Sequence, residues 1–370
     1  MIVADLRLRD FRSYERLELE LQPGTVLVVG PNGAGKTNLL EALHVGTQGF
    51  SPRTRTDAQL VRFGAEAGRV VVAGRRQHSP VEVEVTLRRG EGKRVRLNGA
   101  PLASADDLRS ELATLVFTPD RLAVVKGGPA VRRAYFDRAL GRLSPARAAA
   151  PLVYSGVLAQ RNAALRRVAA RVSGRDALAP WTEQLATRGE ELVEARRAAI
   201  ATLAPVFAER AGELGLPAAR LVYVAEAPGV EQLEAELDRD LDRGWTGSGP
   251  HVDDVGIVAG ARELRAFGSQ GEQRLAVLSL ILAEAALLAE RGRPPLLLLD
   301  DVLSELDSSR RSALAERLAA GGQTVVTATS AGALPREPTQ LVEVELGRAV
   351  SATPAPSSAG LRGTRREGTT

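Results

Sequence analysis

The sequence predicts an α/β fold that is split by an inserted α-helical arm. Short apolar runs occur near both ends of the chain, at residues 26–29 and 296–299. Runs without a polar face are typical of parallel strands whose sheet is covered by helices on both sides. Between them, from about residue 129 to 215, the chain is rich in Ala, Arg and Leu, with apolar residues at helical spacing. We therefore expect two separated halves that assemble into one α/β unit.

The segments before the arm alternate between apolar and polar residues, which is the period of a half-buried β-strand. Residues 98 and 99 are an Asn-Gly pair, a common signal for a tight hairpin turn. A short apolar segment is closed by Pro119, which cannot continue a strand ladder. The strands that we expect in this part cover residues 2–9, 15–21, 68–75, 81–88, 94–97 and 115–117.

A glycine-rich loop follows the first apolar run, because residues 30–37 read GPNGAGKT. Its glycines let backbone N–H groups turn inward around phosphate oxygens, and Lys36 brings a charge to the β and γ phosphates. Thr37 supplies a hydroxyl for Mg²⁺, and the phosphates sit at the N-terminus of the next helix. The loop predicts bound ATP and Mg²⁺, with ATP contacted by Gly30, Pro31, Asn32, Gly33, Ala34, Gly35, Lys36, Thr37 and Asn38.

The inserted segment shows two helical faces separated by a break at residues 173–180. This pattern predicts a helical hairpin whose apolar stripes serve packing. The first stripe contains Leu158, Leu165, Val168 and Val172, and the second contains Trp181, Leu185, Leu192, Ile200, Leu203 and Phe207.

After the arm, the pattern of a strand returns at residues 220–225 and is followed by an acidic helix over about 231–241. The second apolar run, 296–299, ends in Asp300 and Asp301, as a Walker B strand does. Asp300 can reach the Mg²⁺ held by Thr37, and Asp301 stands where a general base orients the attacking water. A core strand with a capping Asp pair is the structural alternative.

Residues 267–274 read FGSQGEQR and lie just before a helix expected from about residue 275. The segment resembles the signature motif of ABC-type ATPases, in which a Ser and a Gly at a helix N-terminus bind a γ-phosphate. In those ATPases the phosphate belongs to the nucleotide of the other subunit, so the resemblance implies a head-to-tail homodimer. The residues concerned are Ser269, Gln270, Gly271, Glu272 and Gln273.

Composition limits the remaining classes of function. The chain of 370 residues has no Cys and three His, which argues against disulfides and a structural zinc site. We see no run of 18 apolar residues and no leader, and we expect a cytoplasmic protein without a membrane partner. The net charge of +4, the pI of about 9.8 and several Arg-Arg pairs permit a DNA partner. With 4% aromatic residues, DNA contacts should be mainly to the backbone.

Taken together, the motifs resemble the RecF family of SMC-like ABC ATPases over most of residues 1–346. One position departs from the family pattern: Val252 stands where the family usually has Arg, which puts any shared role of that position in doubt. The segments that carry the resemblance are DFRSY at 10–14, GKTNLLEA at 35–42, FTPD at 117–120, residues 129–137 with Arg132 and Arg133, GPH at 249–251, Asp253 and Asp254, the signature at Ser269, and residues 298–307.

The resemblance implies an ABC-type ATPase head with mixed β-sheets. It also implies an ATP-dependent, DNA-binding recombination mediator that dimerises on ATP and helps to load recombinase at gapped DNA with RecR and RecO. By position, Arg12 contacts the nucleotide, residues 304–307 form a D-loop that reaches across the dimer, and Thr327 or Thr329 occupies the switch position. Asp301 replaces the more common Glu. Its shorter side chain predicts slow hydrolysis, as in a switch.

We expect an ATPase lobe at residues 1–127, the helical arm at 128–217, a second ATPase lobe at 218–350 and a disordered tail at 351–370. Two alternatives remain. One is another SMC-like or anti-phage ABC ATPase. The other is the nucleotide-binding subunit of a transporter, against which the long arm and the absence of His at residues 327–329 argue.

Overall fold

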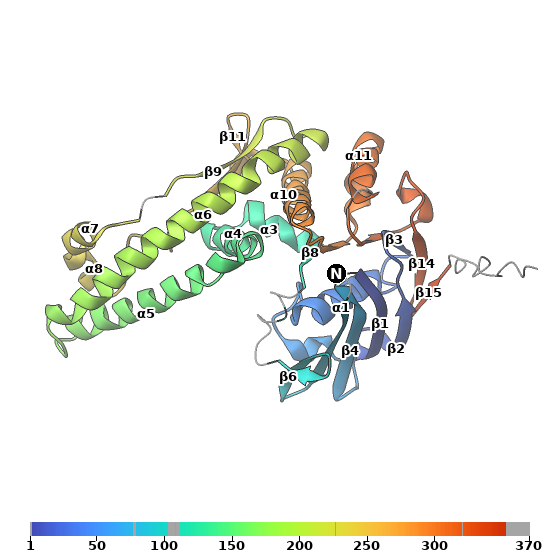
Figure 1. The fold of residues 1–370 in the computed structure, drawn as a ribbon, viewed down its shortest axis with the longest axis horizontal. Helices are drawn as coiled ribbons and strands as arrows, with labels where there is room; N and C mark the ends of the chain where they lie inside the picture. Colours follow the sequence, from blue (N-terminus) through green and yellow to red (C-terminus); the bar gives the residue numbers. More distant parts are fainter. Residues whose placement is uncertain are drawn as a thin grey trace, which may run out of the picture.

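The computed structural model describes residues 2–76, 79–102, 108, 112–225, 227–319 and 321–352, apart from the side chain of Glu305. The expected disordered tail lies outside the described residues from 353 onward. The chain forms a body built on two six-stranded sheets, from which a long helical arm extends to one side (Figure 1).

The central sheet joins the two ends of the chain. Its strand order is β15-β14-β3-β13-β12-β8, and all neighbouring pairs are parallel except β14 with β15. The apolar runs at 26–29 and 296–299 are confirmed as strands of this one sheet, with β13 between them. The strands are β3 (Thr25–Val29), β8 (Thr114–Phe117), β12 (Leu296–Leu299), β13 (Thr324–Ala328), β14 (Gln340–Glu345) and β15 (Arg348–Ser351).

The N-terminal sheet is antiparallel, with the order β2-β1-β4-β5-β6-β7. The expected turn at Asn98 and Gly99 is confirmed, since both residues have positive φ values, 49° and 81°. The strands are β1 (Ile2–Phe11), β2 (Tyr14–Glu20), β4 (Ala67–Arg76), β5 (Ser79–Arg88), β6 (Gly92–Leu97) and β7 (Ala100–Pro101).

Two buried glutamines fasten the two sheets to each other. Gln323 accepts a hydrogen bond from the Val3 backbone N–H and donates to the carbonyls of Val3 and Gln22. Gln340 accepts from the Gln22 N–H and donates to the Glu20 carbonyl. Because both amides bond to backbone of the N-terminal sheet and of the segment that follows β2, they fix the relative position of the sheets without leaving the two amides unpaired.

Helices cover both faces of the central sheet. On one face α1 (Lys36–Gln48) packs between this sheet and the N-terminal sheet, in a core that includes Leu39, Leu43 and Val28. On the other face α10 (Gln270–Glu290) packs against Leu297 and Leu299 together with α3 (Ala123–Lys126) and α4 (Pro129–Leu143). Alternate residues of each central strand therefore enter different cores.

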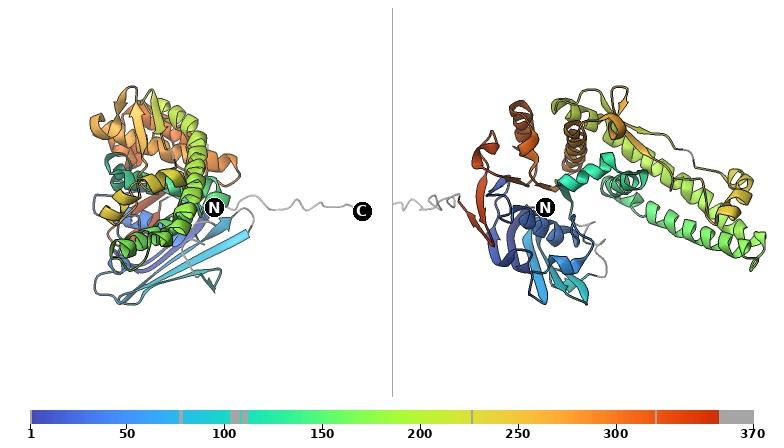
Figure 2. Two further views of the ribbon diagram at one scale, coloured as in Figure 1. Left: turned by 90° about the vertical axis from the view of Figure 1, so that its left-hand side faces the viewer. Right: turned by 180° about the vertical axis from the view of Figure 1, so that it is seen from behind.

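The arm is a helical hairpin of α5 (Ala150–Ala169) and α6 (Ala179–Glu213), which extends away from the body in both face-on views (Figures 1 and 2). The 35-residue α6 belongs to two cores: Leu185 and Leu192 pack with Tyr154 of α5, whereas Leu203 and Phe207 pack in the core that contains α10. One expectation was wrong. Val172 lies beyond the end of α5 and is 67% exposed, because the chain leaves the helix at Ala170.

The distal end of the arm is covered by α7 (Val230–Ala235) and α8 (Leu237–Arg243), two helices where we expected one. The fully buried guanidinium of Arg161 in α5 donates to Asp240 of α8 at 2.8 Å and to the Thr246 hydroxyl at 2.6 Å. This part of the chain therefore packs with the arm, although it lies within the range 218–350 in which we expect the second ATPase lobe.

The remaining elements connect the arm to the body. A small antiparallel sheet, β11-β10-β9, lies beside α6. None of the helices in the described part of the chain is long and apolar enough to cross a membrane. The elements are β9 (Ala219–Tyr223), β10 (Val255–Ala259), β11 (Arg262–Glu263), α9 (Leu264–Phe267), α11 (Ser308–Ala319) and the 3₁₀ turns Asp57–Leu60, Pro119–Leu122, Pro145–Arg147, Arg175–Leu178, Val302–Glu305 and Ala331–Ala333.

Candidate functional site

The glycine-rich loop connects the end of β3 to the start of α1, as the sequence predicts. Gly35 has φ 113°, and a Cβ there would lie 3.0 Å from both the Ser13 and Tyr14 side-chain oxygens. At Gly30 a Cβ would lie 2.2 Å from the Val344 carbonyl oxygen. Only glycine fits these two positions without displacing the backbone or the β1–β2 turn.

Lys36, the first residue of α1, folds over the loop. Its ammonium donates to the carbonyl oxygens of Gly30 at 2.7 Å and Pro31 at 2.9 Å. Asn32 and Gly33 at the tip are exposed, whereas Ala34 is buried in the core beside α1. The loop is therefore anchored at its base and open at its tip, at the positive end of a helix dipole.

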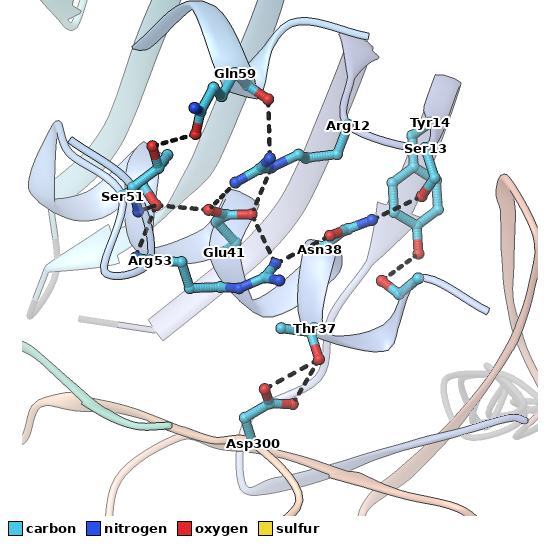
Figure 3. Close-up of polar contacts among 12 residues, drawn as sticks. Arg12, Ser13, Tyr14, Thr37, Asn38, Glu41, Ser51, Arg53, Gln59 and Asp300 are labelled. Carbon is cyan, nitrogen blue, oxygen red and sulfur yellow. Dashed lines mark hydrogen bonds and ion pairs between the residues drawn. The ribbon is translucent and has the colours of Figure 1, made fainter. Parts of the chain in front are cut away.

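The carboxylate that ends β12 lies directly below the start of α1. The Thr37 hydroxyl is 3.1 and 3.0 Å from the two carboxylate oxygens of Asp300 (Figure 3). Burial raises the pKa of Asp300 above its usual value, although hydrogen bonds from Thr327 and Thr37 oppose this rise. The charge of Arg53 also opposes the rise without cancelling it, and a divalent cation would stabilise the buried carboxylate further.

These two groups suit Mg²⁺. Both are hard oxygen donors, and adjacent ligands of an octahedral Mg²⁺ with bonds of about 2.1 Å lie about 3 Å apart. Among the described residues, no group of three or more His, Cys, Asp or Glu side chains forms a larger metal cluster. The donor set therefore fits a cation that takes few protein ligands and completes its shell with water and phosphate.

Thr327 lies on the other side of Asp300, in β13, and is fully buried. Its hydroxyl donates to Asp300 at 2.8 Å and accepts the backbone N–H of Asp301 at 2.8 Å. Asp301 has φ 50°, a left-handed conformation that Asp tolerates better than most residues. Thr327 thus holds the turn after β12, whereas Thr329, just beyond the end of β13, is exposed.

Arg12 is directed towards Glu41, the one charged residue on the buried face of α1. Its guanidinium donates to both carboxylate oxygens of Glu41, and the Arg53 guanidinium contacts one of them at 3.3 Å (Figure 3). The Ser51 hydroxyl donates to the same carboxylate at 2.6 Å. No sequence motif indicated a role for Glu41, Ser51 or Arg53. A charged residue at a buried helix position is the signal that indicates such a partner.

A cleft of about 560 Å³ opens beside this network, next to the start of α1. Asn38 joins the network to the β1–β2 turn, since its side-chain amide accepts a hydrogen bond from Arg53 at 3.3 Å and donates to the Ser13 hydroxyl at 3.0 Å. Phe63 is 95% exposed and also borders the cleft. The cleft is lined by Arg12, Ser13, Asn38, Arg53, Gln59 and Phe63, among others.

The signature segment begins α10. Ser269 accepts the Glu272 backbone N–H at 3.2 Å, and the Glu272 carboxylate accepts the Ser269 N–H at 2.8 Å, which is a capping box. Gln270 and Gly271 are exposed, whereas Gln273 is buried and donates to the Leu264 carbonyl. The buried faces of α10 and α1 pack on opposite faces of the central sheet, and Gly271 at the start of α10 lines one small pocket with Asp300 and Asp301.

These elements define the class of protein: the chain is an ABC-type ATPase head whose halves are separated by a helical arm. The family model described as RecF/RecN/SMC N terminal domain matches residues 2–350. Relatives in the RecF family are 38–39% identical over about nine tenths of the chain. The chain belongs to the RecF family.

Three similarities illustrate the relationship. The DNA replication and repair protein RecF of Acidothermus cellulolyticus is 38% identical over 351 residues, 88% of this chain and 93% of that protein. RecF of Streptomyces avermitilis is 39% identical over 350 residues, 89% of this chain and 93% of that protein. A solved structure of the recombination mediator protein RecF-ATP in the RecFOR pathway has a TM-score of 0.83 and 27% identity, covering 95% of this chain and 99% of that chain.

Proposed function

We propose that this protein is an ATP-dependent, DNA-binding recombination mediator that uses slow ATP hydrolysis as a switch. The observation that carries the proposal is the contact between Thr37 and Asp300 below the glycine-rich loop. It brings together a phosphate-binding loop and a metal-binding carboxylate from opposite ends of the chain. The ATP-bound structure of a RecF protein with 27% identity supports ATP as the ligand.

The loop residues 30–38 bind the phosphates of ATP, with Lys36 at the β and γ positions. Thr37 and Asp300 hold Mg²⁺, which neutralises phosphate charge when it is bound. The nucleoside lies towards the cleft beside Arg12 and Asn38. Arg12 is tied to Glu41, so we propose that it shapes this cleft and touches the nucleotide only through its exposed edge.

Asp301 orients the attacking water, and Thr327 positions Asp301 and Asp300 by its two hydrogen bonds. Because Thr327 has this positioning role, we assign the switch position to Thr329, which is exposed. The carboxylate of Asp301 is one methylene shorter than that of Glu, so it holds the water less closely and hydrolysis is slow. This chemistry suits a protein whose ATP-bound state is long-lived.

Ser269, Gln270 and Gly271 contact the γ-phosphate of a second copy of the chain. The exposed N-terminus of α10 favours an anion, and α10 packs on the face of the central sheet opposite α1, the helix that follows the loop of its own chain. Gln273 is buried and Glu272 is engaged in the capping box, so both support the helix end rather than the phosphate. ATP thus links two copies head to tail.

DNA is the proposed polyanion, bound mainly through its backbone because arginines are many and aromatic residues few. RecR and RecO are the proposed protein partners, a proposal that rests on the RecFOR pathway named for the solved RecF structure. The role that follows is the loading of recombinase at gapped DNA.

Sedimentation velocity with ATP, with ADP and without nucleotide, each with and without gapped DNA, tests this proposal. We expect a dimer only with ATP, and a DNA complex whose affinity falls steeply and linearly as log K against log salt. A monomer under all nucleotide conditions, or binding that is insensitive to salt, would contradict it.

A further inference from the structure

Asp300 has a threonine on each side in the central sheet. Leu299 is paired with Val326 of β13 and with Phe117 of β8, so the residues that flank Asp300 are Thr327 and Thr118. The pairing with β8 extends past the strand end, because the Asp300 N–H donates to the Phe117 carbonyl at 2.9 Å. Neighbouring strands lie about 4.8 Å apart, so the backbone of Thr118 lies beside Asp300 on one side as that of Thr327 does on the other.

Thr118 is on the face of the sheet that α1 covers. Thr114, four residues earlier, donates its hydroxyl to Thr47 of α1 at 2.9 Å, and Val116 packs in the core that contains α1. Thr118 has extended backbone angles, φ −135° and ψ 158°, so the alternation of β8 continues through it. Asp300 receives the Thr37 hydroxyl of α1 on this same face.

The two flanking threonines differ in one respect. The Thr327 hydroxyl has two partners, Asp300 and the Asp301 N–H. The Thr118 side chain is only 4% exposed, and its hydroxyl has no hydrogen-bond partner among the described residues. A buried hydroxyl without a partner is unfavourable, and at a functional site it indicates a group that arrives with a ligand.

We propose that Thr118 is a positioning residue of the metal subsite: its hydroxyl holds a water molecule of the hydrated Mg²⁺ beside Asp300. Mg²⁺ keeps several of its waters in protein sites, and a hydroxyl can donate to or accept from such a water. The inference rests on the proposed function, since it needs nucleotide and metal at Thr37 and Asp300. It adds a residue from β8 to a site so far built from β12, β13 and α1.

The test compares Thr118→Val with Thr118→Ser and with a matched control, Thr324→Val. Thr324 also has a buried hydroxyl without a partner among the described residues, but it lies at the amino end of β13, opposite Leu297. Two quantities are measured for each protein: the urea midpoint without nucleotide, and the affinity for Mn²⁺ by electron paramagnetic resonance in the presence of AMP-PNP.

We expect Thr118→Val to keep or raise the urea midpoint, because it removes an unpaired buried hydroxyl, and to weaken Mn²⁺ binding about tenfold, the lower end of the range for outer-shell partners of metals. Thr118→Ser should bind Mn²⁺ like the parent. Thr324→Val should behave like Thr118→Val in urea but bind Mn²⁺ like the parent.

Unchanged Mn²⁺ affinity in Thr118→Val overturns the inference, whatever its stability. So does weakened binding in both Thr118→Val and Thr118→Ser, because Ser keeps the hydroxyl and a general disturbance of the site, not loss of the hydroxyl, would then be responsible. Failure of the parent to bind Mn²⁺ with AMP-PNP contradicts the proposed function itself. The two failures are thereby distinguished.

Discussion

The guanidinium of Arg12 donates two hydrogen bonds of 2.8 Å to the two carboxylate oxygens of Glu41, whose side chain is fully buried. The pair connects the β1–β2 turn to the middle of α1, the helix that begins at the phosphate-binding loop. A bidentate pair of this kind fixes both position and orientation. The proposed nucleotide site is therefore braced by a carboxylate that has no proposed contact with nucleotide.

Glu41→Gln should lower the free energy of unfolding by about 2–3 kcal/mol, because it leaves a partly buried guanidinium without its countercharge. Urea denaturation measures the change. Glu18→Gln is the matched control: its ion pair with Arg16 is exposed on both sides, and we expect no measurable loss. Equal effects of the two substitutions would contradict the structural role of Glu41.

Lys36→Met should abolish ATP-dependent DNA binding, because it removes the charge at the β and γ phosphates. Fluorescence anisotropy of labelled DNA with and without ATP measures this. Lys126→Met is the control, since Lys126 is an exposed lysine at the end of α3. ATP-dependent DNA binding should persist in this variant. If Lys36→Met still bound DNA in a nucleotide-dependent way, the site assignment would be wrong.

Ser269→Arg should leave ATP binding to the monomer intact but block dimerisation and turnover, because the arginine occupies the space of the partner's γ-phosphate. It also removes a helix cap, which costs about 1 kcal/mol. Ser269→Asp separates the two effects, since Asp can cap α10 yet repels the phosphate. We expect both variants to sediment as monomers with ATP, and parental dimerisation of either one counts against the signature acting in trans.

A mixture of Ser269→Arg and Lys36→Met should recover part of the ATPase activity. In a mixed dimer one site carries both substitutions, and the other combines an intact loop with an intact signature. Activity of the mixture above the sum of the separate variants is the expected result.

Asp301→Asn should slow ATP hydrolysis at least 100-fold while ATP-dependent dimers accumulate, because the amide cannot accept a proton from water. Asn tolerates the left-handed φ of 50° at this position, so the fold of the turn is kept. Phosphate release and sedimentation with ATP report the two effects. Parental turnover in Asp301→Asn would remove Asp301 from the proposed catalytic residues.

The stability of the protein should fall as pH is lowered through about 6.5, in part because of His251. Burial lowers its pKa in the folded state, and the nearby Arg133 lowers it further. The unfolded chain therefore takes up a proton that the folded chain resists, so this contribution is complete above pH 6.5 and is lost below it. Urea unfolding at pH 7.5 and 5.5 should show a smaller difference in His251→Gln than in the parent. An identical pH dependence would exclude His251 as its source.

Local sequence patterns were sufficient to predict the secondary structure of part of the molecule. The two apolar runs and the glycine-rich loop predicted strands β3 and β12 and the start of α1, because burial on both faces and phosphate binding leave a mark in a few adjacent residues. The helical hairpin was predicted because its apolar residues recur at helical spacing on both sides of a break. The packing of α8 on the arm was not, because the Arg161–Asp240 pair joins residues 79 positions apart and neither has a distinctive neighbour pattern.

The candidate nucleotide site was likewise predictable only where local motifs determine its geometry. Thr37 and Asp300 were expected to meet because both belong to motifs with known geometry. The partner of Arg12, the orientation of Thr327 towards the Walker B turn and the place of Thr118 follow from strand register and from which face of the sheet each residue occupies. Register is set by the whole sheet and cannot be read from one segment.

The long α6 packs against α10 near Leu203. From there it continues as one uninterrupted helix to the far end of the arm. From Leu203 to Ala179 a helix rises about 36 Å, so a rotation of ten degrees at the body displaces the tip by about 6 Å. The helix against which α6 packs is α10, whose N-terminus is capped by Ser269. A small tilt of α10 would therefore be enlarged at the far end of the arm in proportion to the length of α6.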